Sequence, residues 1–325
     1  MAPAGLITAV DHGLPGTGRI IRAGLARAFG PPSFNLSEGA GDPGLLGPDS
    51  ASWEIISEPA AIVGGIRALL VQLLHPLAMA GVADHSRFRD DALGRLQRTS
   101  SYVTATTFGA TDDAIGATAA VRRVHRRVAG VAPDGRTYRA DDPRLLAWVS
   151  IALTSSFLAT DRLYAPRPVD DRRADEFVAE QSLLGALLDP RVDLDVVAAK
   201  PSALRDIALP MIEDGTLPMT AAELAAKVQE YSAEWELNAQ GREALRFLLW
   251  PGVPVPIRAG YLPLLAGAIA ALEPRQRAVL RTPLGPSVRM VRFQTRATLT
   301  VMRLAGGVSP SLQAARRRVA APLPA

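Results

Sequence analysis

The sequence predicts an all-α protein, and three observations favour this class. Alanine and leucine, which form helices well, are abundant. Apolar residues recur with helical period in most long segments, whereas the strict alternation typical of strands is scarce. Hydrophobic residues make up 48% of the chain, enough for a buried core. No linker-like stretch divides the 325 residues, so we expect one multi-helix domain over residues 51–305, between an irregular segment (1–50) and a basic C-terminal tail (306–325).

The positive charge of the chain is almost entirely arginine. The formal net charge is only +4, yet the isoelectric point is about 9.8, because Lys200 and Lys227 are the only lysines. Such a small net positive charge does not by itself indicate a protein that binds nucleic acid. The sequence also has no basic motif with interleaved aromatic residues. We expect no nucleic-acid partner, and a helical nucleic-acid-binding protein is kept only as the third hypothesis.

Cysteine is absent, and so are the marks of an export signal. The missing thiols exclude disulfides, cysteine–zinc sites and thiolate-ligated haem or iron–sulfur clusters. Acidic and glycine residues interrupt the N-terminus before any long apolar stretch, which predicts a cytoplasmic protein. A short helix at about residues 18–29 and then an extended loop are expected. The run Arg316–Arg318 should be solvated, which leaves weak contact with an anionic membrane surface open.

The first candidate site residue, His75, stands among apolar residues. Between about residues 62 and 82, leucines and a methionine occupy nearly every side of a predicted helix, so this helix should be buried. Pro76 follows the histidine, removes a backbone donor and should kink the helix. His75 is then either a core histidine bonded to a carbonyl or a group that lines a site. Asp84 is either a helix N-cap or a polar group at the mouth of a pocket.

Two arginines and a threonine share one side of the next predicted helix, residues 91–108. Arg95 and Thr99 are four residues apart, and Arg98 lies close to both. Guanidinium groups near a hydroxyl suit an anion such as a carboxylate or a phosphate. A solvated helix face, with arginines paired to the preceding aspartates, explains the pattern equally well.

A third predicted helix, at about residues 113–131, carries His125. Val121, Val124 and Val128 form a stripe with helical spacing, with the histidine at its edge and four arginines opposite. A histidine in this position can be a core residue, a metal ligand or a haem ligand, and the spacing alone favours the core.

Local signals predict the remaining elements. A turn or short hairpin is expected at residues 132–144, and the capping-box pair Thr220 and Glu223 marks the start of a helix. The prolines of residues 250–263 argue against a regular helix or central strand there. Further helices are expected at about residues 145–164, 170–188 and 287–304.

The sequence has no Walker loop, dinucleotide fingerprint or serine-nucleophile elbow, but it contains an ordered series of weaker motifs. The series reads HPLAMAGVADHSRF, RLQRT, FG, VRRVHRRVAG and YRADDPRLLAWV, and continues through DEFVAEQSLLGALL, LPMTAAELAAKV and YLPLLAG. In this combination, residues 53–285 resemble the oxygenase MpaB / rubber oxygenase (latex clearing protein) catalytic domain family.

The resemblance implies an α-helical fold with a buried pocket for haem b, and O₂ or peroxide as co-substrate. Characterised members of the family include b-type haem oxygenases that cleave carbon–carbon double bonds of isoprenoid chains. By the same resemblance, His125 is the proximal iron ligand, and Arg95 and Thr99 bind beside the haem, with Arg95 neutralising a propionate. His75 and Arg98 become the candidate catalytic residues, and one or the other would donate a hydrogen bond to the distal oxygen.

Two positions depart from the family pattern. Arg98 stands where rubber oxygenase has a lysine that can ligate iron, and arginine stays protonated, which implies an open distal position. Ser150 stands where many relatives have a histidine.

The missing export signal argues against a polymer outside the cell and favours a lipophilic small molecule or natural-product intermediate as substrate. The leading hypothesis is therefore a haem-dependent oxidoreductase, an oxygenase in the first instance, and desaturation is equally compatible with these residues. The alternative is a non-catalytic haem or lipid-binding carrier with the same pocket.

Overall fold

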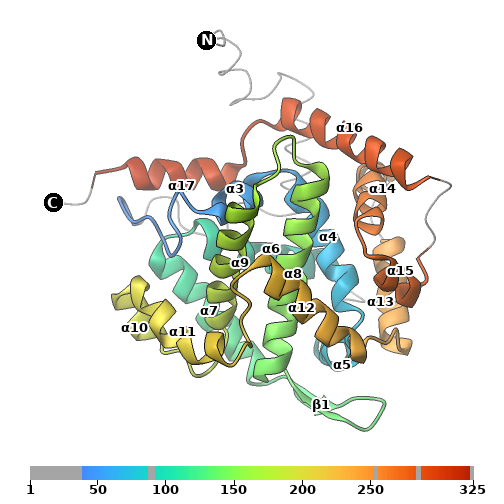
Figure 1. Cartoon of the computed structure of the whole chain (residues 1–325), viewed down its shortest axis with the longest axis horizontal. Helices are drawn as coiled ribbons and strands as arrows, with labels where there is room; N and C mark the ends of the chain where they lie inside the picture. The colour runs from blue at the N-terminus through green and yellow to red at the C-terminus, as the bar shows by residue number, and fades with distance from the viewer. Residues whose placement is uncertain (1–38, 87–91, 252–254, 283–286, 323–325) are drawn as a thin grey trace.

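The computed structural model is all-α apart from one short hairpin (Figure 1). The structure describes residues 39–86, 92–251, 255–282 and 287–322, without the side chains of residues 92–96, 256 and 257. The N-terminal half contains α3 (Ala51–Ser57), α4 (Ala60–Gln72), α5 (Pro76–His85), α6 (Ala92–Phe108), α7 (Thr111–His125), the strands β1 (Ala129–Val131) and β2 (Thr137–Arg139), and α8 (Pro143–Tyr164). Then follow α9 (Asp171–Ala186), α10 (Leu194–Ala199), α11 (Leu204–Glu213), α12 (Ala221–Tyr231), α13 (Ala239–Leu249), α14 (Val255–Ala270), α15 (Pro274–Leu280), α16 (Val288–Gly306) and α17 (Pro310–Ala320).

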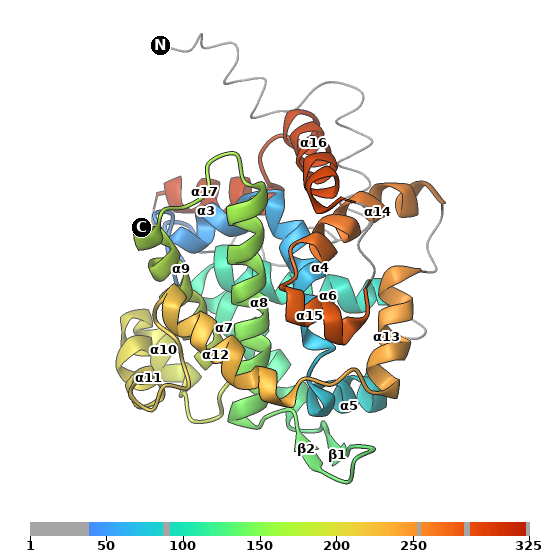
Figure 2. The same cartoon turned by 45° about the vertical axis from the view of Figure 1, so that its right-hand side comes forward.

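The long helix α8 runs through the middle of the fold, with α4 on one side, α9 on the other and α12 crossing in front of it (Figures 1 and 2). Several of its buried side chains, among them Trp148 and Phe157, belong to the main hydrophobic core. Gly64 lets α4 approach closely, because a Cβ atom there would lie 2.7 Å from both Phe157 Cδ1 and Thr160 Oγ1. The expected helix 145–164 and the all-α class are therefore confirmed.

An arginine is buried in this core. Arg67 of α4 is 2% exposed, and it donates hydrogen bonds to the carbonyl of Ala271, to Ser156 Oγ and to Gln276 Oε1. Burial lowers its pKa to about 10, and the carboxylate of Glu273 opposes the shift. Because the guanidinium bonds to Ser156 of α8, to the carbonyl just after α14 and to Gln276 of α15, it joins α4 to all three.

The segment around His75 forms two helices rather than the single kinked helix that the sequence suggested. α4 ends at Gln72, and α5 begins at Pro76 with His75 as its N-cap residue. Proline suits the first helical position, because its missing N–H would have no partner there. Asp84 lies in the last turn of α5, so the expected N-cap role for it is wrong.

No single helix in the described part of the chain is long and apolar enough to cross a membrane. Taken together, α4 and α5 reach the necessary length and composition, but they meet at a bend of 100°.

The valine stripe expected around His125 does not face the core. α7 ends at His125, so Val128 lies beyond the helix, and the side chain of Val124 is exposed. The buried positions of α7 are Thr111, Ala114 and Thr118. The apolar-stripe prediction failed because the helix ends earlier than assumed and buries small residues on another face.

The proline-rich stretch 250–263 is largely helical, which corrects the expectation of an irregular segment. α14 starts at Val255, so Pro256 falls in the first turn, where its missing N–H costs nothing. Pro263 lies inside the helix, and its carbonyl accepts a hydrogen bond from Thr295 Oγ1 of α16. Packing against α16 thus supports a helix that local propensity disfavours.

The C-terminal arginine run is also placed differently from expectation. Arg318 lies on α17 and is 3% exposed, whereas Arg316 and Arg317 are solvated as expected. The Arg318 guanidinium donates to the carbonyls of Asp42 and Phe108. These bonds hold α17 against the start of the described chain. The short helix expected at 18–29 lies outside the described residues.

Other local predictions are confirmed. β1 and β2 form the antiparallel hairpin, with Gly130 opposite Tyr138. Thr220 Oγ1 accepts a hydrogen bond from the N–H of Glu223, and the Glu223 carboxylate accepts one from the N–H of Met219. The helix start predicted at Thr220 is therefore confirmed. The helices expected near 170–188 and 287–304 are α9 and α16.

Candidate functional site

His75 lies at the joint between α4 and α5, and its side chain is buried. The residue is 1% exposed, and neither ring nitrogen has a hydrogen-bond partner among the described residues. A buried polar atom without a partner is costly, and structures rarely retain one without a reason. His75 is therefore not the core histidine bonded to a carbonyl that the sequence left open.

Aromatic side chains surround the imidazole. Its centroid lies 5.7 Å from that of Trp148 on α8 and 6.1 Å from that of Tyr231 on α12. The ring of Trp235 in turn lies 6.4 Å from Trp148. Because these rings keep water away, burial lowers the pKa of His75 below 6.5, and the imidazole is neutral at pH 7.

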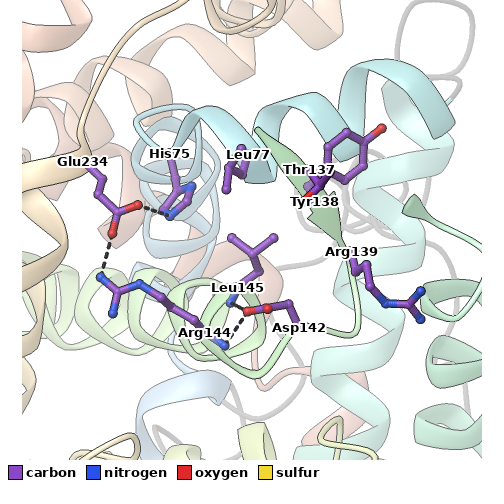
Figure 3. Close-up of a pocket in the computed structure, with 9 residues that line it drawn as sticks. All are labelled: His75, Leu77, Thr137, Tyr138, Arg139, Asp142, Arg144, Leu145 and Glu234. Atoms are coloured by element: carbon purple, nitrogen blue, oxygen red, sulfur yellow. Dashed lines mark hydrogen bonds and ion pairs between the residues drawn. The ribbon is translucent and has the colours of Figure 1, made fainter. Parts of the chain in front are cut away.

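A carboxylate held by arginine lies beside the neutral ring. Glu234 Oε2 is 3.6 Å from His75 Nε2, and Glu234 Oε1 accepts a 2.6 Å hydrogen bond from Arg144 (Figure 3). Arg136 of the hairpin lies 3.8 Å from Oε2. The hydrogen bond from Arg144 holds the pKa of Glu234 below its usual range, so this carboxylate stays ionised next to the histidine.

His75 opens into a cavity of about 220 Å³ at the base of the hairpin. The lining residues come from α5, β2, the start of α8 and the turn after α12: His75, Leu77, Thr137, Tyr138, Arg139, Asp142, Arg144, Leu145 and Glu234 (Figure 3). Several polar groups of this lining already have partners within the protein. Asp142 accepts from the N–H groups of Arg144 and Leu145 at the start of α8.

Tyr138 belongs to the same lining, and its hydroxyl is also engaged. The hydroxyl donates a 2.6 Å hydrogen bond to Asp84. Burial, together with that carboxylate, raises the pKa of Tyr138 to about 12. Through this hydrogen bond, Asp84 of α5 holds the hairpin in place. The ring nitrogens of His75, by contrast, have no hydrogen-bond partner in the described structure, so a bound molecule can bond to them.

His125, the second histidine of interest, ends α7 and does not line this cavity. Its Nδ1 atom is buried and has no hydrogen-bond partner in the described structure. Burial lowers the pKa of His125, and the carboxylate of Asp141 opposes the shift. His125 thus presents a neutral imidazole with an unused nitrogen, which is the form that metals bind.

The helix predicted at residues 91–108 is confirmed as α6. Arg95 and Thr99 lie four residues apart on it, so helical spacing places them on one face. The Arg98 side chain is exposed and that of Thr99 is half-buried, whereas the side chain of Arg95 lies outside the described structure. Neither Arg98 nor Thr99 is among the described residues that line the His75 cavity. The cavity joins His75 to Glu234 and Arg144, and the roles of the α6 residues stay predictions.

Sequence reasoning missed the partners of His75. Glu234 and Tyr231 lie far from it in the chain, and no spacing rule connects such positions. Trp148 and Arg144 belong to the YRADDPRLLAWV motif, so the motif itself was the available signal. The proximity of that motif to His75 depends on the packing of α8 against α4, which is a tertiary property.

Among the described residues, no three His, Asp or Glu side chains come close enough to hold a metal ion by themselves. A porphyrin brings four nitrogen ligands of its own and needs only one or two from the protein. The unbonded nitrogens of His75 and His125 therefore suit an iron porphyrin better than a bare ion.

Comparison with known proteins gives a family. Searches of curated proteins and of solved structures found no match. A family model matches residues 53–321, most of the chain, and its description is "ER-bound oxygenase mpaB/B'/Rubber oxygenase, catalytic domain". The match begins within α3, extends past the end of α17, and includes the hairpin and every residue of the site described above. The chain belongs to this family of oxygenase catalytic domains.

Proposed function

We propose that this oxygenase-family protein is a haem b-dependent oxidoreductase that acts on a lipophilic small molecule, with O₂ or peroxide as co-substrate. Membership of an oxygenase family supports the reaction class. The single observation that carries the haem proposal is the buried Nδ1 atom of His125, which has no hydrogen-bond partner in the described structure. A ligand-free nitrogen on a neutral, partly buried imidazole is what an axial iron ligand requires.

The donor set fits the cofactor. The chain has no cysteine, so a histidine is the strongest axial ligand that it can offer. His125 would hold the iron, and Arg95 and Thr99 of α6 would bind a propionate, for which a guanidinium is a suitable partner. α6 packs against α7, the helix that ends at His125, so these residues come from neighbouring elements.

When bound, haem would supply the redox chemistry with O₂ or peroxide. The protein's own part is to bind the substrate, exclude water and position protons. Leu77 and Leu145 give part of the cavity an apolar wall that suits a lipophilic group.

His75 and Glu234 together can move a proton at the cavity. The neutral imidazole carries a proton on one ring nitrogen and can accept another at the second. The 3.6 Å separation between Nε2 and Oε2 exceeds a hydrogen bond, so transfer to Glu234 requires a small side-chain rotation or a bridging water. Arg98 is proposed as a second donor toward the bound oxygen species, from α6.

An absorption spectrum of the purified protein, before and after addition of haemin, tests the cofactor. A Soret band is expected. His125→Ala should abolish the band or leave a weak one that added imidazole restores, whereas His75→Ala should keep the band and lose turnover. His85→Ala is the matched control, because His85 is exposed and is not among the residues that line the His75 cavity, although it contacts the Ala129 carbonyl and the ring of Tyr138.

The outcomes separate the alternatives. Loss of the band in His75→Ala but not in His125→Ala would reverse the roles of the two histidines. A normal band without oxidation of any bound lipophile would identify a carrier. No haem binding by the wild-type protein would overturn the proposal.

A further inference from the structure

Positive charge is concentrated at the C-terminal end of the chain. Residues 251–325 contain eleven arginines and one acidic residue, Glu273, whereas the preceding 250 residues contain 25 basic and 31 acidic residues. The net charge of +4 is therefore the sum of a positive charge on residues 251–325 and a negative charge on residues 1–250. Such asymmetry creates a local potential that attracts an anionic partner.

The helix α16 displays an apolar stripe on the outside of this basic segment. Met290, Phe293, Val301 and Leu304 are each more than half exposed, and Phe293 reaches 68%. Their spacing, with the exposed Ala297 between them, places them on one side of the helix. The opposite side carries the buried residues Thr295, Leu299 and Met302 and packs against the body. α16 therefore has two apolar sides, and only one is covered within the described structure.

Most arginines of α16 are not paired with a carboxylate in the described structure. Arg292 and Arg296 donate to the carbonyls of Ala270 and Leu163, which do not neutralise a guanidinium. Arg303 pairs with the carboxylate of Glu58. α16 contains no acidic residue, and the exposed Arg316 and Arg317 follow on α17. Figures 1 and 2 show α16 along the upper edge of the molecule, and Figure 1 shows α17 continuing that edge.

We propose that α16 docks on an anionic lipid surface, with its apolar stripe in the headgroup region and its arginines against lipid phosphates. Large apolar side chains flanked by arginines on an outward-facing helix are the pattern of an interfacial helix. An anionic bilayer satisfies both the apolar stripe and the positive charge.

Other occupants fit the stripe less well. A second copy of this chain would bring a basic helix against a basic helix. The first 38 residues contain three arginines and two acidic residues, so they offer no excess of negative charge. Nucleic acid would match the arginines but gain nothing from Phe293 and Met290. This proposal is independent of the proposed catalysis, because binding to lipid requires neither haem nor turnover.

Co-sedimentation of the full chain with vesicles tests the proposal. Binding is expected to mixed phosphatidylcholine–phosphatidylserine vesicles, to be much weaker on phosphatidylcholine alone, and to fall with added salt. Arg289→Gln/Arg296→Gln should weaken binding by about 25-fold, roughly fivefold for each positive charge. Phe293→Gln/Val301→Gln should weaken binding to the anionic vesicles as well, and that residual binding should be more sensitive to salt.

Two control variants change residues of α10, of α11 and of the connection between them, away from α16 (Figure 1). Lys200→Gln/Arg205→Gln removes two exposed charges, and Val196→Gln/Leu209→Gln removes two exposed apolar side chains. Both should bind anionic vesicles like the wild-type chain.

Three outcomes would overturn the proposal. The first is an absence of vesicle binding, or equal losses in the control variants. The second is a change of oligomeric state in Phe293→Gln/Val301→Gln, which would identify a second copy as the occupant. The third is binding to duplex DNA that both α16 variants lose while vesicle binding stays unchanged.

Discussion

His75 Nε2 lies 3.6 Å from Glu234 Oε2, so a neutral imidazole and an ionised carboxylate face each other without a hydrogen bond. Arg144 holds the other oxygen of the carboxylate at 2.6 Å. Protonation of His75 would therefore create a buried ion pair, while the apolar rings around the imidazole oppose its charge.

This relationship predicts how stability depends on pH. The folded-state pKa of His75 is below 6.5, chiefly because of burial. As the pH falls below 6.5, the unfolded chain binds the proton first, so the free energy of unfolding should decrease. Urea unfolding at several pH values checks this. His75→Asn should flatten the decline below pH 6.5, although His125, whose pKa is also lowered, keeps part of it.

Glu234→Gln provides the counterpart experiment. The carboxylate of Glu234 raises the pKa of His75 against the effect of burial, so its removal should lower that pKa further. The decline of stability should then extend to lower pH than in the wild-type chain. A histidine titration followed by NMR that is unchanged in Glu234→Gln would contradict the contact.

Removal of the buried Arg67 guanidinium should be strongly destabilising. Arg67→Ala leaves the carbonyl of Ala271, Ser156 Oγ and Gln276 Oε1 without their donor. We expect a loss of about 3 kcal/mol or more in the free energy of unfolding. Arg67→Lys should not restore it, because one ammonium cannot reach three separated acceptors. Arg205→Ala, an exposed control, should stay within about 0.5 kcal/mol.

Two adjacent glycines of α4 should respond in opposite directions. A Cβ atom at Gly64 would lie 2.7 Å from Phe157 Cδ1, whereas one at Gly65 would meet nothing within 4 Å. Gly64→Ala should therefore cost about 1–3 kcal/mol by overpacking the contact with α8. Gly65→Ala should stabilise the protein by about 0.5–1 kcal/mol through helix propensity. Thermal unfolding of both variants measures the contrast, and equal effects would refute the close approach of the two helices.

The arginine run of α17 offers a similar comparison within three residues. Arg318→Ala removes hydrogen bonds to the carbonyls of Asp42 and Phe108 and should cost about 1.5–3 kcal/mol. Arg316→Ala and Arg317→Ala change exposed side chains and should stay within about 0.5 kcal/mol. Hydrogen exchange should show faster exchange of α17 amides in the first variant only.

Arg98→Lys tests whether α6 faces the proposed haem. A lysine can lose its proton and bind ferric iron, whereas arginine cannot. If the α6 side chains point at the cofactor, the spectrum of the ferric variant should change as the pH rises. A spectrum identical to that of the wild type at every pH would mean that residue 98 does not face the iron.

Periodicity and capping signals predicted α6, α8, α9 and α16 and the start of α12. Thr220 with Glu223, and Ser287 before α16, mark helix starts that depend only on nearby residues. The wrong expectations concern tertiary packing. Pro263 sits within α14 because that helix packs on α16, and Arg318 is buried because α17 meets a segment more than 200 residues away.

The candidate site was predicted only in part for the same reason. The apolar sequence around His75 and the proline after it correctly indicated a buried ring at a helix break. Glu234 could not be inferred, because its approach to His75 depends on how α12 lies across α8. For His125 the valine pattern was misleading, since Val124 points to solvent while part of the imidazole is buried.

The length of α8 sets the distance between α16 and the His75 cavity, which a lipophilic substrate from a membrane at α16 would have to cover. Arg144, in the first turn, holds Glu234 beside the cavity, while the carbonyl of Tyr164, the last residue, is held by Arg303 of α16. A straight helix of 22 residues is about 33 Å long. If α16 rests on a bilayer, the His75 cavity therefore opens about one bilayer thickness away from it. A lipophile would then reach the cavity through the aqueous phase or from a carrier rather than by lateral diffusion from the membrane.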